Sequence, residues 1–144
     1  MLKDRSEKEE TNMREQDSLQ ERNLALMRRF YEARANKDLE RIMECLTEDV
    51  VWRYPGRNVL SREYRGKEDV ASFFRSLREL TGDDFSSKVE RILVDENVAL
   101  VYEHPSGTMK GRSLEWETVL VFNLRDGGIA EGKAFQHTQY ELDE

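Results

Sequence analysis

The stretch Glu48-Asp-Val-Val-Trp-Arg-Tyr-Pro-Gly-Arg-Asn-Val-Leu-Ser-Arg-Glu-Tyr-Arg-Gly66 divides the chain between two sequence patterns. Helical periodicity precedes it, and the alternation typical of strands dominates the last third of the chain. Its apolar run Val50-Val51-Trp52 favours a strand, which Pro55-Gly56 ends because proline lacks a backbone N–H and glycine permits positive φ. We therefore predict a strand, a turn and a polar loop that closes as a lid over a pocket, before a helix begins at Gly66.

Three segments around this stretch have helical spacing. Residues 19–36 place apolar side chains roughly on one face, and Asp38 is suited to cap the following helix. Gly82 lies just past the end of the third helix, as a C-terminal cap does. The apolar stripes of the second and third helices are Leu39, Ile42, Met43 and Leu46, and then Val70, Phe73, Phe74, Leu77 and Leu80.

The last third alternates with a period of two and predicts a meander of four strands. Pro105-Ser106-Gly107 is expected to end the second strand, and Arg125-Asp126-Gly127-Gly128 to form a hairpin turn. The order of helices and strands predicts an α+β fold, with helices packed on one face of a curved antiparallel sheet. The expected strands are residues 89–94, 98–104, 114–124 and 129–140.

The first residues differ in composition from the rest. Residues 1–18 carry four basic and six acidic side chains, with Leu2 and Met13 as the larger apolar groups. Such a segment buries too little surface to offset its ordering entropy. We predict a disordered or fraying tail over residues 1–18 and one domain over residues 19–144; an interaction arm is the weaker alternative.

Composition narrows the classes of partner. The 144 residues suit a single domain with its own core. A formal net charge of −7 lacks the basic footprint of nucleic-acid binding, and no apolar stretch approaches membrane-spanning length. No charged-then-apolar leader opens the chain, so we expect a cytoplasmic protein. The single cysteine, Cys45, is interpreted as a small buried apolar residue rather than a nucleophile.

Five sequence segments carry a resemblance to a known family. They are Phe30-Tyr-Glu-Ala-Arg-Ala-Asn-Lys-Asp-Leu39, Leu46-Thr-Glu-Asp-Val-Val-Trp52, Tyr54-Pro-Gly-Arg-Asn58 through Tyr64-Arg-Gly66, Leu124-Arg-Asp-Gly-Gly-Ile129 and Gln139-Tyr-Glu-Leu-Asp-Glu144. In this order they resemble the SnoaL-like branch of the nuclear transport factor 2-like superfamily, which contains polyketide cyclases and is distantly related to ketosteroid isomerase. The resemblance covers residues 19–144. It implies a cone-shaped, cystatin-like roll with three helices on the concave side of the sheet, an apolar pocket, and often homodimers that pair through the outer sheet face.

The catalytic groups of these relatives are missing here. By the resemblance, the tyrosine and two acids of steroid isomerases would fall at Phe30, at Arg53 or Tyr54, and near Thr118. These side chains do not reproduce a base with an acidic oxyanion donor pair. The histidine and aspartate of polyketide cyclases would fall at Leu120 and Thr138, so neither mechanism transfers directly.

Strand alternation, with the parity that the family resemblance implies, predicts which side chains line the pocket. His104 is the candidate base, because imidazole titrates near neutrality, and Tyr102 lies beside it. A hydrogen-bonded wall residue is the more common role for a lone strand histidine. Arg53 and Arg57 could hold a ligand carboxylate or pair with Glu63 or Glu68 instead. The predicted ligand-binding residues are Phe30, Trp52, Arg53, Tyr54, Leu100, Trp116, Thr118, Leu120, Gln136 and Thr138.

The opposite sheet face is predicted to mix aliphatic and charged side chains, which favours a dimer interface. Its glutamates are expected to pair across strands rather than bind a metal, and no cofactor is expected; they are Glu103, Glu115, Glu117 and Glu131. Two functions remain open. One is a metal-free enzyme of the isomerase, cyclase or hydrolase kind, acting on a hydrophobic, oxygenated ring compound. The other is a non-catalytic ligand-binding or dimerisation module.

Overall fold

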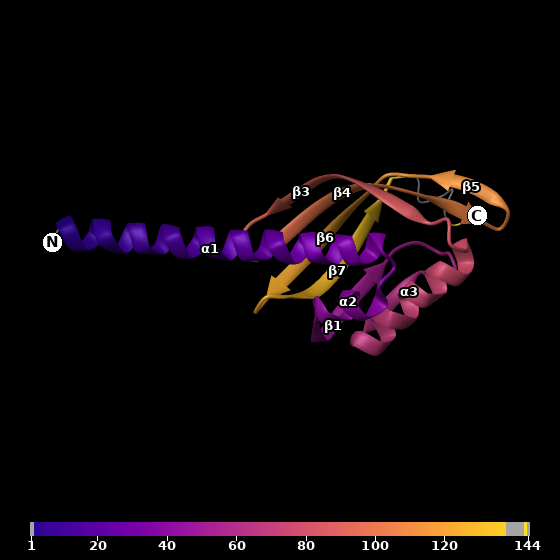
Figure 1. Ribbon diagram of the computed structural model, residues 1–144, viewed down its shortest axis with the longest axis horizontal. Helices are drawn as coiled ribbons and strands as arrows, with labels where there is room; N and C mark the ends of the chain where they lie inside the picture. Colours follow the sequence, from indigo (N-terminus) through magenta and orange to yellow (C-terminus); the bar gives the residue numbers. More distant parts are fainter. Residues whose placement is uncertain (1, 138–142, 144) are drawn as a thin grey trace.

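The computed structural model describes residues 2–137 and residue 143. Its strands form one curved sheet in the order β2-β1-β7-β6-β4-β3, with β5 paired to β4, and every pair is antiparallel except β1 with β7. Helices and strands combine in an α+β fold (Figure 1), as predicted. The elements are α1 (Leu2–Ala35), α2 (Leu39–Glu44), β1 (Leu46–Tyr54), β2 (Arg62–Arg65), α3 (Lys67–Thr81), β3 (Ser86–Val94), β4 (Val98–Met109), β5 (Arg112–Glu115), β6 (Thr118–Arg125) and β7 (Gly128–Gln136).

The core lies between the helices and the inner face of the sheet. Aromatic rings from α1, β1, α3 and β6 meet there: the centroid of Phe30 lies 5.6 Å from that of Phe122, and Trp52 lies 5.7 Å from both Phe122 and Phe74. Such tilted and edge-on pairs contribute beyond the area they bury. Cys45 is buried and free, as predicted. No helix in the described part of the chain is long and apolar enough to span a membrane.

The predicted helix ends are largely confirmed. The Asp38 carboxylate accepts a hydrogen bond from the backbone N–H of Arg41, 3.2 Å away, which caps α2. Gly82 follows α3 with a φ of 67°, a conformation that favours glycine. Leu46 begins β1 rather than continuing the apolar stripe of α2, because that helix ends two residues earlier.

The first residues differ from the predicted disordered tail. From Leu2 they continue α1, which projects beyond the sheet as a single extension (Figure 1). As expected from their low apolar content, residues 6–18 are exposed to solvent. Glutamate, lysine, arginine and glutamine are strong helix formers, and residues added to a helix already nucleated by its packed half need no new nucleus.

The segment predicted as a lid is mostly a hairpin. Its strand ends at Tyr54 and the next helix begins after Gly66, as predicted, but Arg62–Arg65 form β2 against β1. Leu60 and Tyr64 are each only 3% exposed, so their packing anchors the hairpin to the body. No residue from 55–66 lines either of the two cavities that are described in the next subsection. The lid prediction is therefore wrong for these cavities.

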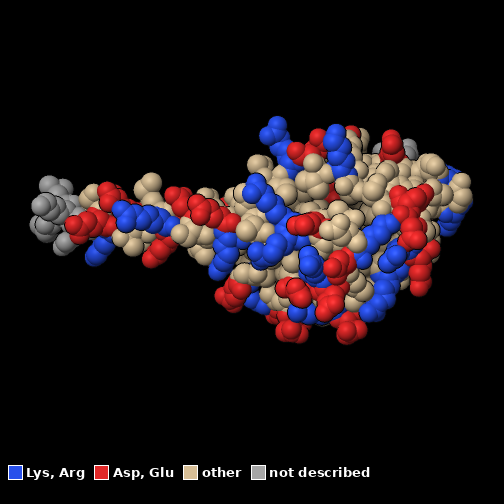
Figure 2. Space-filling model, in the orientation of Figure 1, with Lys and Arg blue, Asp and Glu red and all other residues tan. Residues whose placement is uncertain are grey.

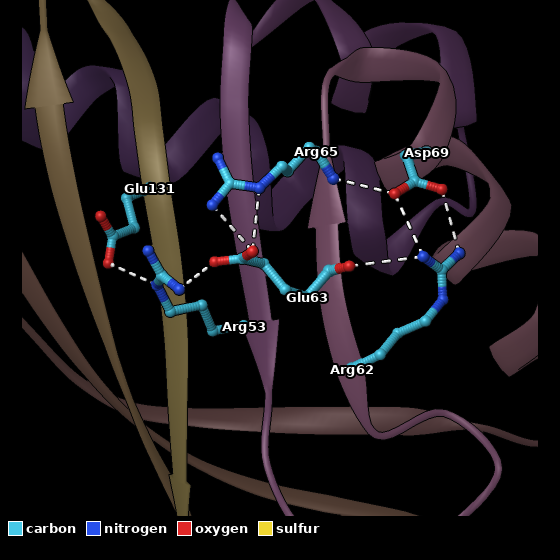
Figure 3. Close-up of polar contacts among 6 residues, drawn as sticks. All are labelled: Arg53, Arg62, Glu63, Arg65, Asp69 and Glu131. Atoms are coloured by element: carbon cyan, nitrogen blue, oxygen red, sulfur yellow. Dashed lines mark hydrogen bonds and ion pairs between the residues drawn. The ribbon is translucent and has the colours of Figure 1, made fainter.

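A ladder of alternating charges crosses β7, β1 and β2 (Figure 3). Arg53 pairs with Glu63 and, at 3.2 Å, with Glu131; Arg65 Nε donates to Glu63 at 2.9 Å. Arg53 is therefore engaged on the outer side of β1. This agrees with the alternative in which it pairs with Glu63.

Two strand boundaries differ from the prediction. β4 continues past Pro105 to Met109, because Ser106–Met109 pair with β5 and the carbonyl of Pro105 accepts a hydrogen bond from Trp116 N–H at 3.0 Å. The segment predicted as a single strand over residues 114–124 is divided into β5 and β6 at residues 116–117. β7 ends at Gln136, and residues 138–140 of the predicted last strand lie outside the described residues.

Candidate functional site

A cavity lies between the concave sheet face, the end of α1 and helix α3. This inner chamber has a volume of about 40 Å³, and its walls are mostly aromatic and aliphatic. Six of the predicted ligand-binding residues line it: Trp52, Tyr54, Trp116, Thr118, Leu120 and Gln136. The other lining residues are Arg34, Phe73, Phe74, Leu77, Phe85, Glu103, Pro105 and Ala134.

A second cavity of about 120 Å³ adjoins the first where α1, α2 and α3 approach each other. This outer chamber shares Arg34, Phe74, Leu77 and Phe85 with the inner chamber, so the two are contiguous. It is also lined by Lys37, Leu39, Ile42, Arg75, Arg78 and Gly82. Pockets of this kind, mostly apolar with a few polar groups, are typical of small-molecule sites.

The predicted orientation of β4 is wrong by one residue. Val101 pairs with Leu120 and Glu103 with Thr118, and residues directly opposite in a sheet share a face. Because Thr118 and Leu120 face the cavity, Glu103 does so too, and Leu100, with 41% of its surface exposed, lies on the outer face. The predicted parity was the one that the family resemblance implies, and a fully buried carboxylate such as Glu103 is uncommon.

The predicted catalytic pair therefore does not lie in the cavity. Tyr102 donates a hydrogen bond to Glu117 Oε2 at 2.9 Å, and His104 Nε2 lies 4.0 Å from Glu90 Oε1. The hydrogen bond to Glu117 raises the pKa of the Tyr102 hydroxyl. Both rings sit on the outer sheet face, 5.1 Å apart, so placing His104 as a base within the pocket is wrong.

Glu103 instead lies at the centre of a buried polar cluster. Its carboxylate, with no exposed surface, accepts hydrogen bonds from Tyr31 Oη at 2.6 Å and Ser87 Oγ at 2.6 Å, and from Arg34 Nη1 at 3.2 and 3.3 Å. A buried carboxylate is costly unless it is paired and hydrogen-bonded in this way. The cluster joins α1, β3 and β4 at the wall of the inner chamber.

The electrostatics of the cluster hold its charges in place. Burial raises the pKa of Tyr31 well above its ordinary value, and the charge of Glu103 adds to the rise. Burial alone would lower the pKa of Arg34, but electrostatic interactions with Glu103 and Tyr31 and the hydrogen bonds to both together outweigh it and leave that pKa raised. Tyr31 is therefore a neutral donor and Arg34 a permanent cation beside the carboxylate.

Two of these residues fall within a segment already quoted for its family resemblance, yet sequence reasoning missed their role. Tyr31 and Arg34 are three residues apart and therefore neighbours on one helix face. They flank the buried stripe of Phe30 and Ala33. The sequence did contain a signal for this buried cluster. It places a tyrosine and an arginine beside an apolar helical stripe, and a lone glutamate in an apolar strand.

One buried polar atom in the inner chamber has no partner. Gln136 Oε1 is buried and accepts no hydrogen bond within the described residues. A buried acceptor left unpaired costs about 1–3 kcal/mol. Nearby, burial raises the pKa of Tyr54, and a hydrogen bond with the Gln136 side chain partly offsets that rise. Gln136 thus contributes its side chain to the chamber wall and holds an unpaired buried acceptor there.

The remaining predicted residues lie elsewhere. Phe30 has no exposed surface and packs in the core without lining either chamber. Arg53 and Leu100 lie on the outer side, and Thr138 lies outside the described residues. Within residues 2–137 and 143, no group of three or more His, Cys, Asp or Glu side chains is arranged to hold a metal ion.

Fold and cavity together define an α+β roll with a cavity between sheet and helices. The sequence matches the SnoaL-like domain over residues 27–132, and the chain belongs to the SnoaL-like family. No curated protein matches the sequence.

Solved structures share the fold at low sequence identity. Bal32a, from a soil-derived mobile gene cassette, is 22% identical with a TM-score of 0.83, covering 87% of this chain and 96% of its own. A nuclear transport factor 2-like protein of Burkholderia pseudomallei is 21% identical with a TM-score of 0.77, covering 84% and 95%. A candidate polyketide cyclase from Sinorhizobium meliloti is 18% identical with a TM-score of 0.65, covering 77% and 94%. These TM-scores establish the shared fold.

Proposed function

We propose that the chain binds a small, mostly apolar ring compound in its two contiguous chambers. The unpartnered Gln136 Oε1 in a mostly apolar, aromatic wall carries this proposal. An engineered apolar cavity of roughly 150 Å³ takes up benzene, so an outer chamber of about 120 Å³ suits a single ring. A hydroxyl that projects from that ring into the inner chamber would supply the donor that Gln136 lacks.

Titration of the ¹⁵N-labelled protein with phenol and with toluene tests this proposal. Phenol has the O–H donor, and toluene has nearly the same shape without it. We expect both to shift amide signals of chamber residues, and phenol to bind more tightly. Gln136→Leu should weaken phenol binding by several-fold to tenfold, as expected for one hydrogen bond, and leave toluene binding unchanged.

A cavity-filling variant gives the matched control. Ala134→Leu places a larger side chain at the inner chamber and should reduce binding of both compounds, whereas Ala130→Leu, on the same strand but outside both chambers, should not. Shifts confined to the outer sheet face, or binding unaffected by Ala134→Leu in a variant that remains folded, would contradict the proposal.

The second candidate is an enzyme that performs acid–base chemistry of the isomerase or cyclase kind. It is favoured by the Tyr31–Glu103–Arg34 cluster, which places a carboxylate and a cation at the chamber wall, with the neutral donor Tyr31 hydrogen-bonded to the carboxylate behind them. Each Glu103 oxygen already accepts two hydrogen bonds, however, which favours holding Arg34 in place over taking a substrate proton.

Deuterium incorporation into cyclohexanone in D₂O distinguishes binding from this catalysis. An acid–base enzyme should accelerate the exchange next to the carbonyl, and Glu103→Gln should abolish the acceleration while preserving the shape of the side chain. Equal exchange with and without protein leaves binding as the function.

We further propose a homodimer that pairs through the outer sheet face. Leu93 lies opposite Leu100, and Val119 opposite Phe135, with 59%, 41%, 37% and 51% of their surfaces exposed. Adjacent exposed apolar side chains on a sheet favour association. In sedimentation velocity, Phe135→Lys should shift the protein toward monomer, and Val59→Lys, on the hairpin, should not. A wild-type monomer at high micromolar concentration would refute the dimer.

A further inference from the structure

The outer chamber has a distinctive charge. Its lining contains four cationic side chains and no acidic one: Arg34, Lys37, Arg75 and Arg78. The whole chain, in contrast, has a formal net charge of −7. Figure 2 shows basic side chains over the region of α3 and the end of α1, with acidic ones among them. A cationic lining in an acidic protein is a local feature that overall composition does not explain.

Some of these cations already have partners. Arg34 pairs with Glu103, and Asp83 accepts hydrogen bonds from Arg78 Nε at 2.9 Å through its carboxylate and from Lys37 through its backbone carbonyl. Arg75 makes no ion pair with any residue that the structure describes. Asp83 pairs with Arg78, and the charge of Lys37 helps to lower the pKa of both Asp83 and Asp84. Three cations, Lys37, Arg75 and Arg78, thus stand against two carboxylates, and net positive charge remains at the mouth.

The floor of the same chamber is apolar. Leu39 and Ile42 from α2, Phe74 and Leu77 from α3, and Phe85 surround it. Cations thus stand at the edge of a hydrophobic floor large enough for one ring. An occupant that satisfies both must be amphipathic, with an apolar body and an anionic end.

We propose that the occupant is a single-ring organic carboxylate, whose ring lies on the apolar floor and whose carboxylate contacts Arg75 and Lys37 at the mouth. This inference rests on the proposed binding function and names its ligand class. The guanidinium fork of arginine matches a carboxylate in two parallel hydrogen bonds, which a neutral isostere cannot reproduce. Because Lys37 and Arg75 are exposed, the charge contribution should be modest and sensitive to salt.

The test compares 3-phenylpropionate with its neutral isostere, 3-phenylpropionamide, by NMR titration of the ¹⁵N-labelled protein. We expect the carboxylate to bind up to about tenfold more tightly at low salt, from two exposed charge contacts, and most of this difference to disappear in 1 M NaCl. Arg75→Gln should weaken carboxylate binding about threefold and leave amide binding unchanged. Arg28→Gln makes the same charge change outside both chambers and should affect neither.

The outcomes separate this inference from the function on which it rests. If the two compounds bind equally in the chamber, or if Arg28→Gln reproduces the effect of Arg75→Gln, the carboxylate proposal is wrong and the ring-binding function stands. If neither compound binds in the chamber, both fail. Tighter binding of phenyl phosphate than of 3-phenylpropionate would overturn the assignment of a carboxylate.

Discussion

Removal of the cation from the Glu103 cluster should destabilise the protein severely. Arg34→Met preserves much of the side-chain length but leaves the fully buried Glu103 carboxylate with only Tyr31 and Ser87 as donors. Breaking a buried ion pair by deleting one partner costs about 3–5 kcal/mol. Domains of this kind have a total free energy of unfolding of about 5–15 kcal/mol, so a large part would be lost.

A double-mutant cycle measures the coupling. Urea denaturation followed by circular dichroism gives the free energy of unfolding of the wild type, Arg34→Met, Glu103→Leu and the double variant. We expect the double variant to be more stable than Arg34→Met, because no buried charge remains unpaired. Additive losses, or a loss below about 1 kcal/mol for Arg34→Met, would show that the cluster is not the tightly coupled buried site described above.

Three further outcomes follow from the structure. Gly132→Ala should destabilise the protein by about 1–3 kcal/mol and shift its tryptophan fluorescence. The reason is that the new Cβ would lie 2.4 Å from Trp52 Cζ3. An unchanged melting temperature would contradict this packing. Hydrogen bonds from two backbone N–H groups lower the pKa of Asp95 in the folded protein. These bonds therefore stabilise the protein fully above the pKa of an unfolded aspartate, near 3.9, and this stabilisation is lost as the pH falls through the lower pKa of the folded state. The stability of Asp95→Asn should therefore depend less on pH than that of the wild type at acid pH, and parallel pH profiles would refute the assignment. Deletion of residues 2–17 should leave the melting temperature within a few degrees of the wild type, because the described side chains there are exposed; a large loss in calorimetry would reveal contacts that the monomer does not have.

The fold was predictable because its signals are local. Asp38, Gly66 and Gly82 mark helix ends through backbone chemistry that acts within a few residues, and the apolar stripe of α3 follows from its own spacing. The orientation of β4 was not predictable in the same way. One residue of register exchanges the two faces of a strand, and only long-range pairing of Glu103 with Tyr31 and Arg34 makes a buried carboxylate tolerable.

The residues of the candidate site also differ in how far local sequence patterns could place them. Trp52, Thr118 and Leu120 line the inner chamber, where the predicted orientation of β1 and β6 places them. Tyr102 and His104 were wrongly assigned because their strand alternates between two partly apolar faces. The outer chamber depends on the packing of α2 against α3, which no local pattern specifies.

A crystal structure of the protein soaked with phenol tests the central claim most directly. The account predicts a ring in the outer chamber, with its hydroxyl directed into the inner chamber and within hydrogen-bonding distance of Gln136 Oε1. Chambers closed by neighbouring side chains, or phenol bound only at the outer sheet face beside Tyr102 and His104, would contradict it.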